Sequence, residues 1–156
     1  MANQDAAFGM KPVRMMGGSP YTGGQSRYRI AANYGTSIFQ GDMVAQVTGG
    51  GVEVHADGGT VPIVGVFNGC SYTDPTTGEQ VFSNYYPAST NASDIIAFVI
   101  DDPNVVFEIQ ADDTFPVADL FGNFDIVYTS SGSTVTGISG AELDVTTGAT
   151  TASLPI

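Results

Sequence analysis

The sequence predicts an all-β protein, a compact β-barrel or β-sandwich with an extended N-terminal arm and at most a short helical turn. Its 156 residues include 20 glycines, β-branched residues are frequent, and strong helix formers are few. The apolar segments are short and are separated by Gly, Asp and Asn turn residues, a pattern typical of antiparallel strands. The length indicates a single domain with an arm.

Residues 1–25 are predicted to form the arm. Seven of them are glycine or proline, at spacings that suit neither a helix nor a regular strand, so the arm is expected to be extended and irregular. It also carries more apolar side chains than a solvated tail would, and we expect it to lie against its own domain or a neighbouring subunit. These apolar anchors are Phe8, Met10, Val13, Met15, Met16 and Tyr21. Because the first alternating strand begins near Ser26, the domain is expected to stay folded without residues 1–14.

Residues 26–156 are predicted to form the β-rich domain, as a series of strands divided by turns. The expected strands are 26–32, 43–47, 52–56, 61–72, 80–88, 95–100, 105–110, 124–130, 133–139 and 141–147. Gly65 and Gly69 predict bulges or tight bends in the longest strand. Pro87 places its own strand at an edge or an end, since proline cannot donate to a ladder.

Two further features belong to the C-terminal part of the domain. Residues 114–122 are expected to make one helical turn, with Thr114 as its cap and Gly122 as its end. The final apolar stretch, residues 150–156, resembles the start of a strand. It predicts a C-terminus that is either truncated or completed by a partner.

Acidic residues gather in residues 96–113, beside unbroken apolar runs. The sequence DDPN at 101–104 has turn chemistry, because Asp accepts local backbone hydrogen bonds and Pro presets φ. Glu108 is the one acid within a strand and is expected on its solvent face. We therefore interpret these acids as turn and surface residues. They are Asp101, Asp102, Glu108, Asp112 and Asp113. The alternative is a calcium site in an oxygen-rich loop at 101–104, 111–113 or 141–144, although none has EF-hand spacing.

The candidate catalytic residues are His55 and Cys70, the one histidine and the one cysteine. His55 is expected to be exposed and Cys70 to be a small buried apolar residue. A catalytic His55, or a Cys70–His55 pair, has the residue types for nucleophilic catalysis, yet no nucleophile motif accompanies them. The interpretation is that the chain is not an enzyme and uses neither a cofactor nor a metal.

A group of aromatic residues offers a different kind of site. It consists of Tyr72, Phe82, Tyr85 and Tyr86. Such a group could stack on sugar rings, but in a glycine-rich β-domain core and edge packing is the more common role.

Charge is divided unevenly along the chain. Residues 1–29 hold one acid and all four bases, which are Lys11, Arg14, Arg27 and Arg29, whereas residues 30–156 hold 15 acids and no base. The net charge of −12 argues against nucleic-acid binding, which needs bases to neutralise phosphates. No apolar run is long enough to cross a membrane. A basic arm on an acidic body predicts that the arm engages an acidic partner.

Five segments spread over nearly the whole chain carry a family resemblance. They are residues 1–24, GDMV at 41–44, NYYPAS at 84–89, DDPNVVFEIQAD at 101–112 and TGISGAELD at 136–144. They resemble the small capsid decoration, or cement, proteins encoded beside the major capsid protein in tailed bacteriophages. The resemblance implies a structural protein that forms homotrimers or homodimers and bridges major capsid protein subunits. Such a protein would be made in the host cytoplasm and reside on the capsid surface of the virion.

The residues expected to contact the capsid or a neighbouring subunit lie in the arm and in the first strand of the domain. They are Phe8, Met10, Lys11, Val13, Arg14, Met15, Arg27 and Arg29. The alternative function is a carbohydrate-binding or adhesin-like β-domain, and a hydrolase is the third class considered.

Overall fold

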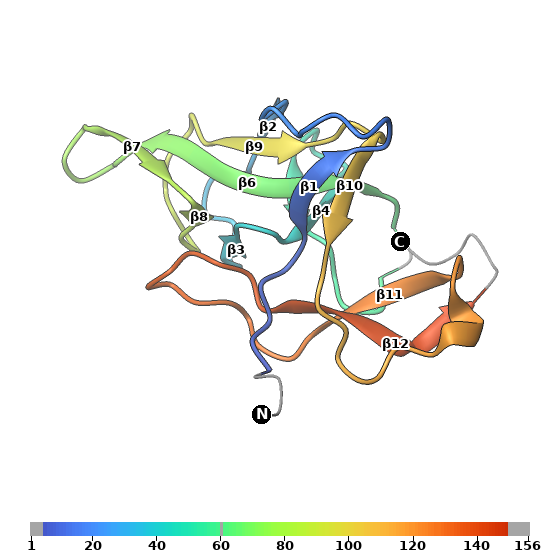
Figure 1. Cartoon of the computed structure of the whole chain (residues 1–156). Coiled ribbons are helices and arrows are strands. Elements are labelled where there is room, and N and C mark those ends of the chain that lie inside the picture. Colours follow the sequence, from blue (N-terminus) through green and yellow to red (C-terminus); the bar gives the residue numbers. More distant parts are fainter. Residues whose placement is uncertain (1–4, 60, 150–156) are drawn as a thin grey trace.

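The structure, a computed structural model, describes residues 5–59 and 61–149, which contain twelve strands and one 3-10 turn joined by turns and loops (Figure 1). The strands are β1 (Lys11–Met15), β2 (Ser26–Arg29), β3 (Ile38–Phe39), β4 (Met43–Gln46), β5 (Val52–Val54), β6 (Ile63–Thr73), β7 (Gln80–Ser83), β8 (Tyr85–Tyr86), β9 (Ile96–Ile100), β10 (Val105–Glu108), β11 (Asn123–Tyr128) and β12 (Ala141–Ala149). Strand makes up 44% and helix 2% of the structure, so the predicted all-β class is confirmed. The described strands do not close into a barrel.

A six-stranded antiparallel sheet forms the centre of the molecule. Its strands follow the order β2-β9-β6-β4-β5, and β7 pairs with the far part of β6. Three separate two-stranded pairs accompany it, β1–β10, β3–β8 and β11–β12. Figure 1 shows β6 running through the sheet as its long axis, with the β1–β10 pair crossing near one end.

The two glycines inside β6 mark the places where its ladders shift. The register with β9 shifts between Phe67 and Gly69, and the register of β4 shifts opposite Gly65. A Cβ at Gly65 would lie 2.3 Å from the Ile100 carbonyl oxygen, so β9 approaches this strand more closely than any side chain permits. The predicted bulges are confirmed. They allow β6 to pair with three neighbouring strands, β4, β7 and β9.

Replacing Gly65 with alanine should lower the free energy of unfolding by about 3 kcal/mol, because the added methyl forces β9 away from β6. Chemical denaturation measures the change. Gly49→Ala is the matched control, since a Cβ there meets no atom within 4 Å, and it should change stability by less than about 1 kcal/mol. Equal stability of the two variants would contradict the close approach of the strands.

Apolar clusters cover both faces of the central sheet. Successive strand residues point to opposite faces, and neighbours in β4, β6 and β9 accordingly enter different clusters. One cluster contains Val44, Phe67 and Val99, together with Tyr86 and the predicted buried Cys70. The other is smaller. It contains Met10, Met43, Val66, Ile100, Val105 and Ile126, contributed by the arm, the central sheet, β10 and β11.

Two segments differ from their predicted backbone. The middle of the arm is not irregular, since Lys11–Met15 forms β1 and pairs with β10. Pro12 is compatible with this because β1 belongs to a two-stranded pair, where a strand has an unpaired edge. Residues 133–139 were predicted as a strand but form a turn, in which the Gly137 amide donates to the Ser133 carbonyl at 2.7 Å. Gly137 has φ +73, a value that ends regular strand structure.

The predicted helical turn is present as the 3-10 turn Val117–Asp119. Its N-terminal flanking residue is Pro116, and no side chain caps it, so the expected Thr114 cap is wrong. The Gly122 amide closes the turn by donating to the Asp119 carbonyl at 2.9 Å. The expectation for residues 150–156 lies outside the described residues.

Candidate partner-binding surface

The strand β1 presents two exposed bases and an exposed apolar side chain. Its ladder with β10 pairs Lys11 with Glu108 and Met15 with Val105, and shifts between Pro12 and Arg14. This irregularity leaves Lys11, Val13 and Arg14 all exposed, while Met15 is half-buried against the smaller core. The strand thus attaches to the body through one set of side chains and offers another set outward.

The arm is fixed to the body where it enters β1. Gly9 has φ +68, and a Cβ there would lie 2.6 Å from the Gly41 carbonyl oxygen. The Met10 amide donates to that oxygen at 2.9 Å, and the Gly41 amide donates to the Phe67 carbonyl of β6, also at 2.9 Å. Met10 is only 9% exposed. The backbone crossing of the two glycines therefore connects the arm directly to the central sheet.

The other two bases lie on β2, an edge strand of the central sheet. Arg27 and Arg29 are exposed, whereas Tyr28 between them is half-buried. The Tyr28 hydroxyl donates to Asp101 at 2.8 Å, and this hydrogen bond raises the pKa of the tyrosine. The Arg27 guanidinium lies 6.0 Å from the centre of the Phe98 ring.

Both basic strands flank the same acidic turn. The Met16 amide, just after β1, donates to the Asn104 carbonyl at 2.7 Å, and the Ser26 hydroxyl at the start of β2 donates to Asp101 at 3.0 Å. The turn at 101–104 therefore joins the two strands that carry all the bases. We name the exposed side chains of Lys11, Val13, Arg14, Arg27 and Arg29 the basic face.

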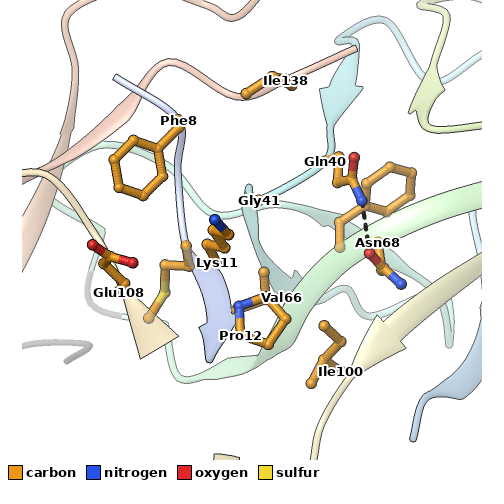
Figure 2. A pocket seen from close by; sticks show the side chains of 12 residues that line it. Phe8, Lys11, Pro12, Gln40, Gly41, Val66, Asn68, Ile100, Glu108 and Ile138 are labelled. Carbon is orange, nitrogen blue, oxygen red and sulfur yellow. Dashed lines mark hydrogen bonds between the residues drawn. The ribbon is translucent and has the colours of Figure 1, made fainter. Parts of the chain in front are cut away.

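A groove of about 430 Å³ lies beside the arm (Figure 2). Its lining residues are Phe8, Met10, Lys11, Pro12, Gln40, Gly41, Val66, Phe67, Asn68, Ile100, Glu108 and Ile138. Figure 2 shows Phe8 and Glu108 along one side of this groove and the hydrogen-bonded Gln40–Asn68 pair along the other. The partly buried Phe8 therefore faces a mostly apolar hollow, which adds a site for an apolar side chain next to the basic face.

Asp42 stabilises the turn beneath the arm and is 2% exposed. Its carboxylate accepts from the Phe39 amide at 2.7 Å and from the Ser139 hydroxyl at 2.5 Å. Burial nevertheless raises the pKa of this carboxyl from 3.8 to about 6. The folded state thus holds a proton here at a pH where the unfolded chain has lost it.

The Asp42 contribution to stability should therefore be fully present below about pH 4 and be lost as the pH rises through about 6. The wild-type free energy of unfolding minus that of Asp42→Asn should fall by roughly 3 kcal/mol across this window, at 1.36 kcal/mol per pKa unit. Denaturant titrations at a series of pH values measure it. Subtracting the variant removes the contributions of the acids that both proteins share. A difference that stays constant, or grows with pH, would refute a raised pKa.

His55 is buried, contrary to the expectation of exposure. It is 1% exposed, and its Nε2 lies 2.8 Å from the Val61 carbonyl. The Cys70 thiol is directed elsewhere, to the Tyr85 carbonyl at 3.4 Å, and burial raises its pKa to about 12. His55 Nδ1 has no hydrogen-bond partner among the described residues. The two side chains do not form the considered Cys–His pair.

The aspartates of residues 101–113 accept hydrogen bonds, local ones at Asp102 and Asp113 and long-range ones at Asp101 and Asp112. Asp102 accepts from the Asn104 amide at 2.8 Å, Asp113 from the Thr114 amide at 2.6 Å, and Asp112 from the Val145 amide at 3.1 Å. Glu108 is exposed on β10 as predicted. Within residues 5–59 and 61–149, no group of three His, Cys, Asp or Glu side chains is placed to hold a metal ion.

The aromatic group does not form one platform. Tyr72 and Tyr86 are 9% and 0% exposed and belong to the larger core, whereas Phe82 is 71% exposed. Tyr85 stacks on Phe39 with ring centres 5.6 Å apart. The core-and-edge interpretation of these residues therefore describes the structure better than a sugar-stacking surface.

Three buried acids were not anticipated from the sequence. They are Asp42, Asp125 and Glu142. Glu142 accepts from Thr129 and from Gln110, the latter at 3.2 Å. Each acid lies in a strand or turn whose neighbours in sequence are apolar, which was the one available signal of burial.

In comparisons with known proteins, no protein-family model, curated protein or solved structure matches the chain. None of the helices in the described part of the chain is long and apolar enough to cross a membrane.

Proposed function

We propose that the chain is a structural capsid decoration, or cement, protein of a tailed bacteriophage, which stabilises the head by bridging major capsid protein subunits. It acts without catalysis, on the capsid surface of the virion. The basic face is the surface that contacts the shell. The arm residues Phe8, Met10 and Met15 attach β1 to the body through their buried or half-buried side chains.

The observation that carries the proposal is the position of the four bases. Each of their side chains is exposed on β1 or β2, and none forms an ion pair with an acid of the described residues. The rest of the chain, residues 30–156, has 15 acids and no base. Such a separation gives the molecule one face that attracts an acidic partner and a body that repels it, which favours a single docking orientation.

The rigidity of the arm also supports a role in clamping. A loose arm would lose conformational freedom on binding, at a cost of about 1–2 kcal/mol for each residue that becomes ordered. Here β1 is already paired with β10 and connected to β6 through Gly41. The backbone that carries the exposed side chains is therefore ordered before binding. Less of the free energy of contact is then offset by the entropy cost of ordering the arm, so the affinity is higher.

The same charge division supports self-association. The basic face of one copy complements the acidic body of another, which is a contact between two different surfaces. Contacts of this kind form closed rings when the rotation between copies allows it. We therefore include a homotrimer in the proposal; a homodimer is included as the case in which two copies make this contact reciprocally about a twofold axis.

Sedimentation with undecorated heads of the encoding phage tests the function. Purified protein should pellet with the heads at a fixed ratio to the major capsid protein, and bound heads should resist heating better than bare ones. The control is serum albumin, another acidic protein, which should stay in the supernatant. Failure to pellet at low and at moderate salt would contradict the proposal.

A further inference from the structure

The turn just before β11 exposes three large apolar side chains. The exposed fractions are 80% for Val117, 55% for Leu120 and 103% for Phe121. The Leu120 amide donates to the Val117 carbonyl at 3.4 Å, and residues three apart lie on the same side of a 3-10 turn. The three residues therefore present apolar surface from neighbouring positions of one turn, and we name them the apolar tip.

Phe121 also has a backbone conformation that does not suit a large side chain. Its φ is +71, in the left-handed region, where the Cβ comes close to the backbone oxygen. The side chain gains nothing within its own chain, because it is wholly exposed. The Phe115 ring nevertheless fixes the turn to β11 by packing on Phe124, with ring centres 5.2 Å apart. Strain of this kind concentrates at functional sites, and a contact outside the chain would compensate for it.

The groove beside the arm has the complementary shape. Its volume of about 430 Å³ is in the range of sites that enclose a small molecule, so it has room for a phenylalanine ring. Phe8 and Pro12 are half-buried and Ile138 is 41% exposed. These three side chains offer apolar surface to a side chain that enters the groove. Figure 2 shows Lys11 between Phe8 and Pro12.

The charges of the apolar tip and the groove are opposite. The turn of the tip contains the half-buried Asp119, and Asp113 is exposed four residues before the turn begins. Lys11 at the groove is exposed and forms no ion pair with an acid of the described residues. Glu108 also lines the groove, so an acidic tip is repelled there and is attracted toward Lys11. The charges therefore favour one orientation of the tip in the groove.

The tip lies away from the groove of its own chain. Figure 1 shows the turn, in orange, at the outer end of the β11–β12 pair, apart from β1 and the segment that leads into it. We propose that the apolar tip of one copy inserts into the groove of a second copy, with Asp119 facing Lys11. The contact joins two different surfaces, so it continues from copy to copy until a ring closes. This inference rests on the self-association in the proposed function and leaves the rest of the basic face to the shell.

Sedimentation equilibrium of the full chain measures the contact. Phe121→Asn should weaken self-association about tenfold or more, because the buried ring is lost. In dilute solution, where both proteins are monomers, its melting temperature should not fall, since asparagine tolerates the left-handed backbone. Phe82→Asn is the matched control: Phe82 is 71% exposed on β7, and this variant should associate like the wild type. A wild type that is still monomeric at about 1 mM, or a Phe121→Asn variant with wild-type association, would overturn the inference.

Mixing two defective variants identifies the two surfaces. Phe121→Asp removes the apolar tip and Ile138→Asp places a charge in the groove, so each variant alone should be monomeric. Their equimolar mixture should form complexes that contain both, because each keeps the surface that the other lacks. Lys11→Glu and Asp119→Lys should each weaken association at low salt and restore it when combined in one chain. A mixture that stays monomeric, or a double variant as weak as either single variant, would contradict the pairing.

Sedimentation with undecorated heads separates this inference from the capsid role. A protein that associates through the tip and groove but does not pellet with heads would contradict the capsid role alone. A protein that pellets with heads, yet associates equally well after Phe121→Asn, would overturn the tip-and-groove contact alone.

Discussion

Deletion of residues 1–15 should lower the free energy of unfolding by about 4 kcal/mol or more. The deletion removes β1 from its ladder with β10 and takes Met10 out of the smaller core, where it packs with Met43, Val66 and Ile126. Losing a buried methionine side chain alone costs about 2–5 kcal/mol. The sequence led us to expect a domain that stays folded without residues 1–14. The pairing of β1 and the burial of Met10 instead predict a large loss of stability, because the arm contributes to the core.

Chemical denaturation of the deletion variant and of two point variants checks this result. Met10→Ala should account for a large part of the loss, at about 2–4 kcal/mol. Val13→Ala is the matched control in the same strand, because Val13 is 47% exposed, and it should change stability by no more than about 0.5 kcal/mol. A deletion variant as stable as the full chain would show that the arm does not contribute to the core.

Neutralising the two arm bases should weaken capsid binding without changing the fold. If the proposed function holds, the Lys11→Gln/Arg14→Gln variant should lose about tenfold in affinity for undecorated heads at low salt, because the exposed bases no longer attract an acidic partner surface. The gap between variant and wild type should narrow as salt is raised, since the screening length falls to roughly 10 Å at 0.1 M. Sedimentation over a series of salt concentrations measures both effects.

The matched control changes the net charge by the same amount elsewhere. Gln46→Glu/Gln80→Glu adds two negative charges at exposed positions on β4 and β7. If capsid binding responds only to net charge, this control will weaken it as much as the arm variant does. That outcome, or an arm variant with full affinity, would contradict a specific basic face.

Local sequence rules predicted the parts of the fold that depend on neighbouring residues. The bulges at Gly65 and Gly69 and the exposed Glu108 follow from backbone geometry and strand alternation. The pairing of β1 with β10 did not follow, because it joins residues almost a hundred positions apart and β1 contains Pro12. The strand expected at 133–139 failed for a local reason, since Gly137 has φ +73 and its amide closes a turn onto the Ser133 carbonyl.

The candidate site was predicted only in part. The separation of the bases from the acidic body was visible in the sequence, and the structure adds that the two strands that carry them, β1 and β2, both contact the turn at 101–104. The burial of His55 could not be predicted, because it results from the loop after β5 closing over the ring.

Site-specific photo-cross-linking to the capsid tests the central claim most directly. A benzoylphenylalanine residue is placed at Val13 in the basic face or, as the comparison, at Phe82, which is 71% exposed on β7 near the opposite end of β6 (Figure 1). Both proteins are mixed with undecorated heads and irradiated, and adducts are identified by mass spectrometry. The proposed function predicts cross-links from position 13 to the major capsid protein and few from position 82. Cross-links from position 82 with none from position 13 would contradict it.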